Sequence, residues 1–204
     1  TITFPPGIYL CGTLYLKSNI TLQLEEGAIL RASPDPADYN ADDFCPENRV
    51  SVSDCASGAH LIVGYRIESL KLTGGGKIDG NARAWINQVD PKPAKYPNYL
   101  LPAWRPSQLL FFCCSTDIEL EHITIEDAPY WTCLFLGCDQ VAVSRITICN
   151  DPKGHNGDGL DIDCCSRVTI HDCNISGSDD CIAVRGCSSR LQENKVCEKI
   201  RVRN

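Results

Sequence analysis

The chain has 204 residues, 43% of them hydrophobic, which is enough for one sizeable core. Its formal charge of −7 and the lack of a basic run argue against a nucleic-acid-binding protein. No apolar run approaches the length needed to cross a bilayer, so membrane insertion is not expected either.

Short strands of alternating apolar and polar residues recur along the chain. Two early segments, Ile20–Leu24 and Leu70–Leu72, alternate in this way. Later repeats begin at Ile118, Val141, Val168 and Ile200, at steps of 141 − 118 = 23, 168 − 141 = 27 and 200 − 168 = 32 residues. Alternation indicates one buried and one solvated face, and short strands at a coil-length step are typical of a parallel β-solenoid. The sequence therefore predicts an all-β solenoid.

Two regions interrupt this repeat. Residues 32–60 are rich in Asp, Pro and Ser, and residues 87–106 contain five prolines, Pro97 among them. Strand patterns resume after each region, so both are predicted to be long loops rather than linkers. The chain starts and stops inside strand patterns. We therefore expect one domain over residues 1–204, an incomplete solenoid that is truncated at both ends.

Fourteen cysteines allow two interpretations. A disulfide framework is one, although it suits short secreted chains better. The repeat favours the other, because Cys138, Cys165 and Cys197 each lie three residues before the first aliphatic residue of a strand, and Cys173 occupies a position that Ile123 and Ile146 fill elsewhere. Cysteine thus interchanges with aliphatic residues, as a small buried hydrophobe does. Zinc is disfavoured because no CxxC pair exists.

Three carboxylates have the spacing of one coil. Asp158 and Asp180 are separated by 180 − 158 = 22 residues, and this offset aligns Leu160 with Ile182. On neighbouring parallel strands the two acids would lie roughly 4.8 Å apart, with Asp179 beside them. Like charges that close cannot all ionise easily, so one carboxyl should keep its proton to a higher pH. A protonated acid beside an ionised base is the requirement of glycoside hydrolysis.

The chain resembles a known family in six motifs that occur in the expected order. They are Gly7-Ile8-Tyr9 with Lys17–Leu22, Gly74–Gly80, Arg105-Pro106, Pro129–Thr132, Asn156–Gly159 and Ser178–Cys181. Together they look like glycoside hydrolase family 28, the polygalacturonase family. The resemblance covers essentially the whole chain and implies a right-handed parallel β-helix of the pectin lyase type.

The resemblance also implies a function. It suggests hydrolysis of a pectic polysaccharide, of the polygalacturonan or rhamnogalacturonan type, with inversion and without a metal or cofactor. Asp179 would be the general acid, Asp158 and Asp180 would activate water, and Asn156 and Asp161 would support the site. The partner is then a polysaccharide, and we expect a monomer. The compartment stays open, with a secreted or periplasmic location slightly favoured over the cytoplasm.

Two departures from the family pattern matter. Gly157 stands where the family usually has Thr, which we expect to change local order rather than chemistry. The family's Gly-His-Gly motif, and its Arg-x-Lys pair that grips the substrate carboxylate, would lie beyond Asn204. We therefore expect the 204-residue piece alone to be poorly active. Endo or exo action and the identity of the uronide do not follow from the sequence.

Other side chains are candidates for contact with substrate. Trp104 with Arg105, in the proline-rich loop, is predicted to form part of the cleft wall. His155 is a further candidate because it lies next to the acids. Trp131 is expected to pack against a turn. The remaining histidines, among them His60, are expected in solvated or turn positions.

Two alternative functions remain open. The run Asn156-x-Asp158-x-x-Asp161-x-Asp163 offers several oxygen ligands for calcium, and a calcium site would favour a pectate lyase. A lyase also needs a basic proton abstractor, and no Arg or Lys is embedded among the three acids. The other alternative is a non-catalytic β-helix that binds polysaccharide.

Overall fold

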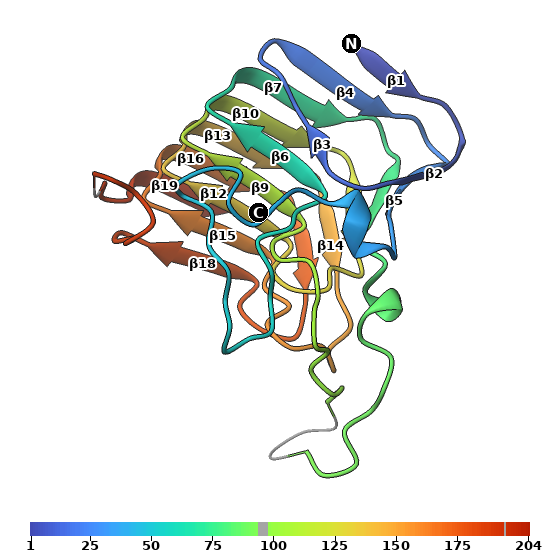
Figure 1. Ribbon diagram of the computed structural model, residues 1–204. Coiled ribbons are helices and arrows are strands. Elements are labelled where there is room, and N and C mark those ends of the chain that lie inside the picture. The colour runs from blue at the N-terminus through green and yellow to red at the C-terminus, as the bar shows by residue number, and fades with distance from the viewer. Residues whose placement is uncertain (94–97, 194) are drawn as a thin grey trace.

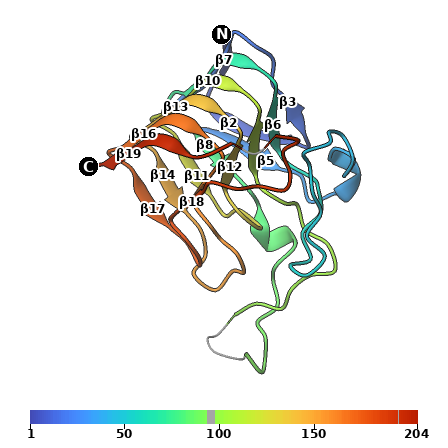
Figure 2. The ribbon, with the colours of Figure 1, turned by 90° about the vertical axis from the view of Figure 1, so that its left-hand side faces the viewer.

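The computed structural model describes residues 1–93, 98–193 and 195–204, so that Pro97 lies outside the described residues. Three parallel sheets, here called A, B and C, form the body of the protein (Figure 1). Each full coil of the chain contributes one strand to each sheet in the order A, B, C. Figure 2 shows these coils stacked in chain order from the N-terminal to the C-terminal end. The predicted all-β, right-handed parallel β-helix is confirmed by this architecture and by the solved folds it matches.

The strands are short throughout. Sheet A contains β1 (Ile2–Phe4), β4 (Ile20–Leu24), β7 (Glu68–Thr73), β10 (Thr116–Glu121), β13 (Asp139–Ser144), β16 (Ser166–His171) and β19 (Glu198–Arg203). Sheet B contains β2 (Gly7–Cys11), β5 (Ala28–Ala32), β8 (Lys77–Asp79), β11 (Thr124–Glu126), β14 (Thr147–Cys149) and β17 (Asn174–Ser176). Sheet C contains β3 (Leu14–Tyr15), β6 (Ile62–Tyr65), β9 (Leu110–Cys113), β12 (Cys133–Leu136), β15 (Leu160–Asp163) and β18 (Ile182–Arg185).

Alternation along each strand divides the side chains between the core and the outside. On β10 the two buried residues are Ile118 and Leu120, and their neighbours are partly exposed. Identical positions stack from coil to coil, since Ile118 pairs with Val141 and Val141 with Val168. This aliphatic stacking holds the register, because a slip of one residue would turn the apolar set to solvent.

Cysteines belong to this core, as the repeat predicted. Cys138 and Cys165 are 1% and 0% exposed, and the partly buried Cys173 and Cys197 pack against the same cluster. Each of these thiols donates to a carbonyl of the preceding coil, for example Cys138 to Phe112 O and Cys165 to Phe135 O. All fourteen cysteines are free in the structure.

Both predicted long loops enter at the same corner, where the chain passes from sheet B to sheet C. Residues 33–61 connect β5 to β6 and contain the 3-10 turn η1 (Pro36–Asp38). Residues 80–109 connect β8 to β9 and contain η2 (Ala82–Ala84), and the described part of this loop projects from the stack in both views (Figure 1, Figure 2). The prediction of long loops is confirmed, and both lie beside the corner that carries the three acids.

The expectation for His60 was wrong. Its side chain is fully buried, contacts Gln108 O and Asn48 Oδ1 at 2.8 Å each, and stacks on Phe111. Burial lowers the pKa of His60 to about 3, so the ring stays neutral. This histidine anchors the first long loop on the outer face of sheet C.

No helix in the described part of the chain is long and apolar enough to span a bilayer.

Candidate active site

Two successive corners between sheets B and C bring the acids together. Asp158 ends the segment that leads into β15, and Asp179 and Asp180 occupy the equivalent segment before β18. Leu160 pairs with Ile182, and Ile162 pairs with Val184, as the 22-residue offset predicted. The ladder continues into the corner, where Gly159 N donates to Asp180 O at 2.9 Å. The register therefore positions Asp158 directly over the Asp179-Asp180 pair.

The three carboxylates converge. One oxygen atom from each of Asp158, Asp179 and Asp180 lies within 4.8 Å of the other two. Asp158 is 5% exposed, whereas Asp179 and Asp180 are open to solvent. Burial, reinforced by the charges of the other two acids, raises the pKa of Asp158 to about 6. The site thus combines one buried carboxyl that binds a proton readily with two carboxyls that face the solvent.

Gly157 joins these two corners tightly. Its N–H donates to Ser178 Oγ at 3.0 Å, and a Cβ at position 157 would lie 2.5 Å from that oxygen. A threonine at position 157 would therefore require Ser178 to move. The departure from the family pattern is consistent with the local contact, because Gly157 and Ser178 accommodate each other.

A buried ion-pair group lies on the strands that follow the acids. Asp161 and Asp163 are 0% and 5% exposed, and both accept hydrogen bonds from the guanidinium of Arg185. Burial, with the charge of Asp158, raises the pKa of Asp161 to about 7 even though Arg185 favours the ionised form. Asp161 Oδ2 has no hydrogen-bond partner. Arg185 also packs over the ring of Trp131, with 4.6 Å from Cζ to the ring centroid.

Several residues predicted to contact substrate have other surroundings. Asp161 is fully buried, so it can support the site through Arg185 but cannot touch a sugar. Arg105 is also fully buried and cannot form the surface of a cleft wall. It holds Asn156 instead, donating from Nη2 to Asn156 Oδ1 at 3.0 Å. Both side chains are buried because the Arg105 guanidinium and the Asp161 carboxylate each bind polar partners inside the protein.

Trp104 lies at an open surface, as a wall residue should. It is half-buried, packs edge-on against Trp85 and Tyr39, and lines a cleft of about 350 Å³ with Val50, Val52 and Ala103. Whether Trp104 contacts sugar stays a prediction. Trp131, expected to pack against a turn, stacks on Tyr130 at 5.4 Å between ring centroids.

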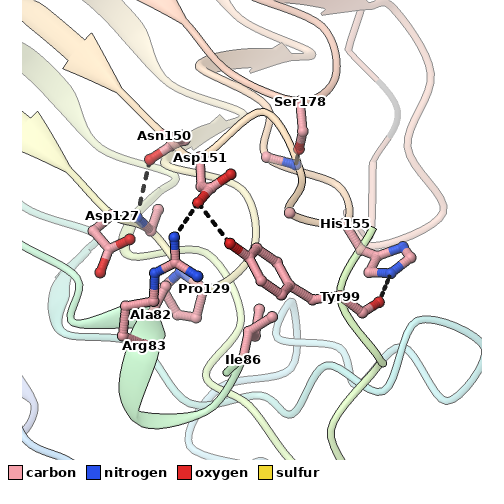
Figure 3. A pocket seen from close by; sticks show the side chains of 13 residues that line it. Ala82, Arg83, Ile86, Tyr99, Asp127, Pro129, Asn150, Asp151, His155 and Ser178 are labelled. Carbon is pink, nitrogen blue, oxygen red and sulfur yellow. Dashed lines mark hydrogen bonds and ion pairs between the residues drawn. The ribbon is translucent and has the colours of Figure 1, made fainter. Parts of the chain in front are cut away.

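His155 lines a second, narrower pocket at the same corner. Figure 3 shows Arg83 and Tyr99 both reaching Asp151 in this pocket, while the His155 ring contacts Tyr99 O. The free volume of this pocket, about 20 Å³, accommodates a single water molecule rather than a sugar ring. Arg83, Tyr99 and Asp151 bind one another here, and contact of His155 with substrate stays a prediction.

Arg185 is a site residue that the sequence analysis did not name, although the repeat carries a signal for it. The offset that aligns Asp158 with Asp180 also aligns Asp163 with 163 + 22 = 185, and the two residues are cross-strand partners. A carboxylate and a guanidinium at that spacing predict an ion pair across the rung. The sequence pattern does not indicate the hydrogen bond that Tyr130 OH donates to Asp54 Oδ2, which joins the corner before β12 to the first long loop.

The extended calcium run does not form one site. Asp161 and Asp163 bind Arg185, and among the described residues the only cluster of three or more suitable ligands is Asp158, Asp179 and Asp180. A divalent cation could bind there, since carboxylate oxygens are its preferred ligands. Removal of such a cation by a chelator would abolish the activity of a calcium-dependent lyase but not that of a metal-independent hydrolase.

A family model, "Glycosyl hydrolases family 28", matches residues 17–199. The chain belongs to this family. The resemblance that the six motifs suggested is thereby confirmed for the greater part of the sequence.

Individual proteins agree with the assignment to family 28. A "Probable polygalacturonase" of Vitis vinifera is 30% identical over 185 residues, which are 89% of this chain and 36% of that protein. The chain therefore spans about a third of this relative's length. The structure of the Yersinia enterocolitica family 28 exopolygalacturonase matches with a TM-score of 0.77 and 20% identity, over 98% of this chain and 42% of the other.

The same fold also occurs in a protein with another role. The surface adhesin PfbA of Streptococcus pneumoniae matches with a TM-score of 0.65 and 18% identity, over 99% of this chain and 48% of that chain. Likeness of the β-helix alone thus shows the fold and not the activity. Function has to be argued from the acids.

Proposed function

We propose that this family 28 protein hydrolyses a pectic polysaccharide through the Asp158, Asp179 and Asp180 carboxylates. The observation that supports the proposal best is the convergence of these three acids, one of which is buried with a raised pKa. Clusters of titratable groups with perturbed pKa values are typical of catalytic sites. A solvated structural turn would have no need to bury an acid beside two others.

In this proposal the catalytic roles are divided among the three acids. Asp179 protonates the glycosidic oxygen, and Asp158 and Asp180 polarise a water molecule on the opposite face of the sugar. The exposed position of Asp179 and Asp180 lets a bound chain reach them from solvent. Asn156 and Asp161 support the site from behind, the first through Arg105 and the second through Arg185.

The raised pKa of Asp158 fits this division once the three acids are treated as a coupled group. Closely interacting carboxyls titrate together, so a shared proton belongs to the group rather than to one residue. In the free protein the most buried acid, Asp158, holds it best. A bound sugar would place its glycosidic oxygen beside Asp179, the residue that has to donate the proton. The proton can then pass to Asp179, leaving Asp158 ionised as a base.

The stereochemical outcome needs its own measurement. Inverting glycosidases usually hold their two carboxyl groups about 6.5–9.5 Å apart, and retaining enzymes about 5–5.5 Å. The nearest oxygens of the three acids here lie within 4.8 Å, which is closer to the second range. Inversion is proposed because the family implies it, and proton NMR of the first sugar anomer released tests it. A retained anomer would rule out single displacement.

Replacement of Asp179 by Asn tests the general acid. In the full-length enzyme we expect the rate of reducing-sugar release to fall by at least ~10²-fold, the usual contribution of such a group. The matched control is Asp43→Asn, an exposed acid in the loop before β6, which should keep full activity. A mild loss in D179N would dismiss this role for Asp179. Binding of pectin without any cleavage by the complete, unaltered protein would favour a polysaccharide-binding function instead.

A further inference from the structure

Arg105 is the largest side chain that is fully buried in the described part of the chain. Arginine is almost never fully buried unless it is paired with an acid. None of the ion pairs among the described residues includes Arg105. Its cationic head is held by hydrogen bonds and by the face of the Tyr130 ring rather than by an ion pair, which makes the choice of acceptors informative.

Four acceptors surround the guanidinium, and they come from three separate segments. Nη1 donates to Pro129 O and to His155 O at 2.8 Å each. Nη2 donates to Asp54 O at 2.7 Å and to Asn156 Oδ1 at 3.0 Å. One side chain thus joins the first long loop, the corner before β12 and the corner before β15.

A second layer tightens this junction. The guanidinium lies over the Tyr130 ring, 4.8 Å from Cζ to the centroid, and Tyr130 OH donates to Asp54 Oδ2 at 2.9 Å. The backbone of Arg105 is fixed too, because its carbonyl accepts from Ser57 N and Ser57 Oγ. The arginine therefore has little freedom to move, and neither do the groups it binds.

Two of the four bonds reach the residues immediately before the buried acid. Asn156 has a φ of +56°, the left-handed conformation that costs most residues energy and that Asn tolerates. Arg105 binds both the carbonyl that precedes Asn156 and its side-chain oxygen, so it holds this turn from both sides. Asp158 follows two residues later, without a hydrogen bond to its Oδ1. The turn therefore acts together with the strand register on the position of that carboxylate.

We propose that Arg105 is a positioning residue, which holds the turn at residues 155–156 so that Asp158 stays buried against Asp179 and Asp180. This inference deepens the proposed function and rests on it, since it takes Asp158 as an acid of the site. It differs from a purely stabilising role because it assigns to Arg105 control over the environment of one particular carboxyl.

Loss of the Arg105 charge and loosening of the turn would shift the pKa of Asp158 in opposite directions. Simple loss of a nearby positive charge raises the pKa of an acid, whereas loosening of the turn would hydrate Asp158 and lower its pKa toward the usual range. Arg105 is not among the groups that set the pKa of Asp158, which are burial, Asp179, Asp180 and Arg185. A fall in the Asp158 pKa after a change at Arg105 would therefore come through the turn.

The experiment follows the Asp158 carboxyl carbon by NMR titration in three variants. Arg105→Lys keeps the charge but cannot reach four acceptors in the planar arrangement of a guanidinium. Asn156→Gly keeps the left-handed turn and removes only the side-chain acceptor of Arg105. Arg31→Lys is the matched control, because Arg31 binds Asp79 through Nε at 2.8 Å on sheet B.

We expect the pKa of Asp158 to fall by at least ~0.5 in R105K and N156G and to stay unchanged in R31K. An unchanged or raised Asp158 pKa in folded R105K or N156G would overturn the proposal, even if the melting temperature fell. Should R105K fail to fold, N156G decides alone. The titration does not depend on turnover, so an absence of hydrolysis by the full-length enzyme would reject the proposed function without affecting this result.

Discussion

Arg185 and Asp163 are direct partners across β15 and β18, and Arg185 Nε donates to Asp163 Oδ1 at 2.7 Å. The same guanidinium also binds Asp161, so one cation compensates two carboxylates that are almost completely buried. Removal of one partner from a buried ion pair leaves an uncompensated charge and is far more costly than the net value of the pair.

Arg185→Met should therefore destabilise the protein by about 3–5 kcal/mol at pH 7.5. The loss should be smaller at pH 4.5, where the two acids can bind protons and become neutral. Urea unfolding at both pH values measures this. The control is Arg167→Met, since the exposed pair with Asp139 should contribute less than about 1 kcal/mol. Equal losses at the two pH values would contradict the buried-pair explanation.

Asp158→Asn should stabilise the protein while reducing its activity. The pKa of Asp158 is raised to about 6 in the folded state, so the stability this acid contributes is complete below its unfolded value and is lost as the pH rises through 6. Asparagine carries no charge to bury, and the gain should reach about 1–2 kcal/mol at pH 7.5 and vanish near pH 3.5. Denaturant midpoints of D158N and the unaltered protein, compared at both pH values, test this.

The exposed Asp43→Asn variant controls for general loss of negative charge, and it should show no such pH-dependent gain. A D158N protein that is less stable at pH 7.5 would mean that the ionised carboxylate is favoured where it lies. In that case crowding of the three acids would not explain the site.

The coils and the three acids were predictable because a β-helix repeats its register. Aliphatic residues stack on each rung, and a strand period of two leaves no other alignment that keeps them buried. The 22-residue offset between Asp158 and Asp180 therefore converts directly into proximity. The cysteine interpretation succeeded for the same reason, since Cys138 and Cys165 occupy stacked core positions.

The contacts of the long loops were not predictable in this way. Loops have no repeat, and a polar residue in them can face solvent or find acceptors from distant segments. Arg105 and His60 both look like surface residues in the sequence, yet both are fully buried because carbonyl oxygens and side chains from other segments satisfy them. Only the folded chain shows that partners lie about fifty residues away, as for Arg105 and His155.

Chelation separates the two pectin-degrading chemistries. Among the described residues, the three acids form the ligand cluster that a divalent cation could occupy. Calcium bound there would favour a lyase. If the proposed hydrolysis is correct, EDTA should leave reducing-sugar release by the complete enzyme unchanged, and added calcium should not be required. Ultraviolet absorbance of an unsaturated product, and its loss on chelation, would support the lyase.

The vicinal pair Cys113-Cys114 gives a prediction independent of hydrolysis. The Cys113 thiol lies 3.8 Å from Cys114 Sγ, and its hydrogen bond, aided by Lys195 and Arg66, lowers the pKa of Cys114 to about 7. Cys164 occupies the equivalent corner two coils further on, but it is 1% exposed and burial raises its pKa. The thiolate is the reactive form. At pH 7 iodoacetamide should therefore modify Cys114 at least ~10-fold faster than Cys164.

Peptide mass spectrometry across a pH series should place half-maximal labelling of Cys114 near its pKa of about 7. Cys113→Ala removes the donor that stabilises the thiolate, so labelling should shift to higher pH in that variant while the accessibility of Cys114 stays the same. An unshifted profile in C113A would assign the reactivity to exposure alone. Equal rates for Cys114 and Cys164 would show that the corner opens readily, because a buried thiol can react only when its surroundings move.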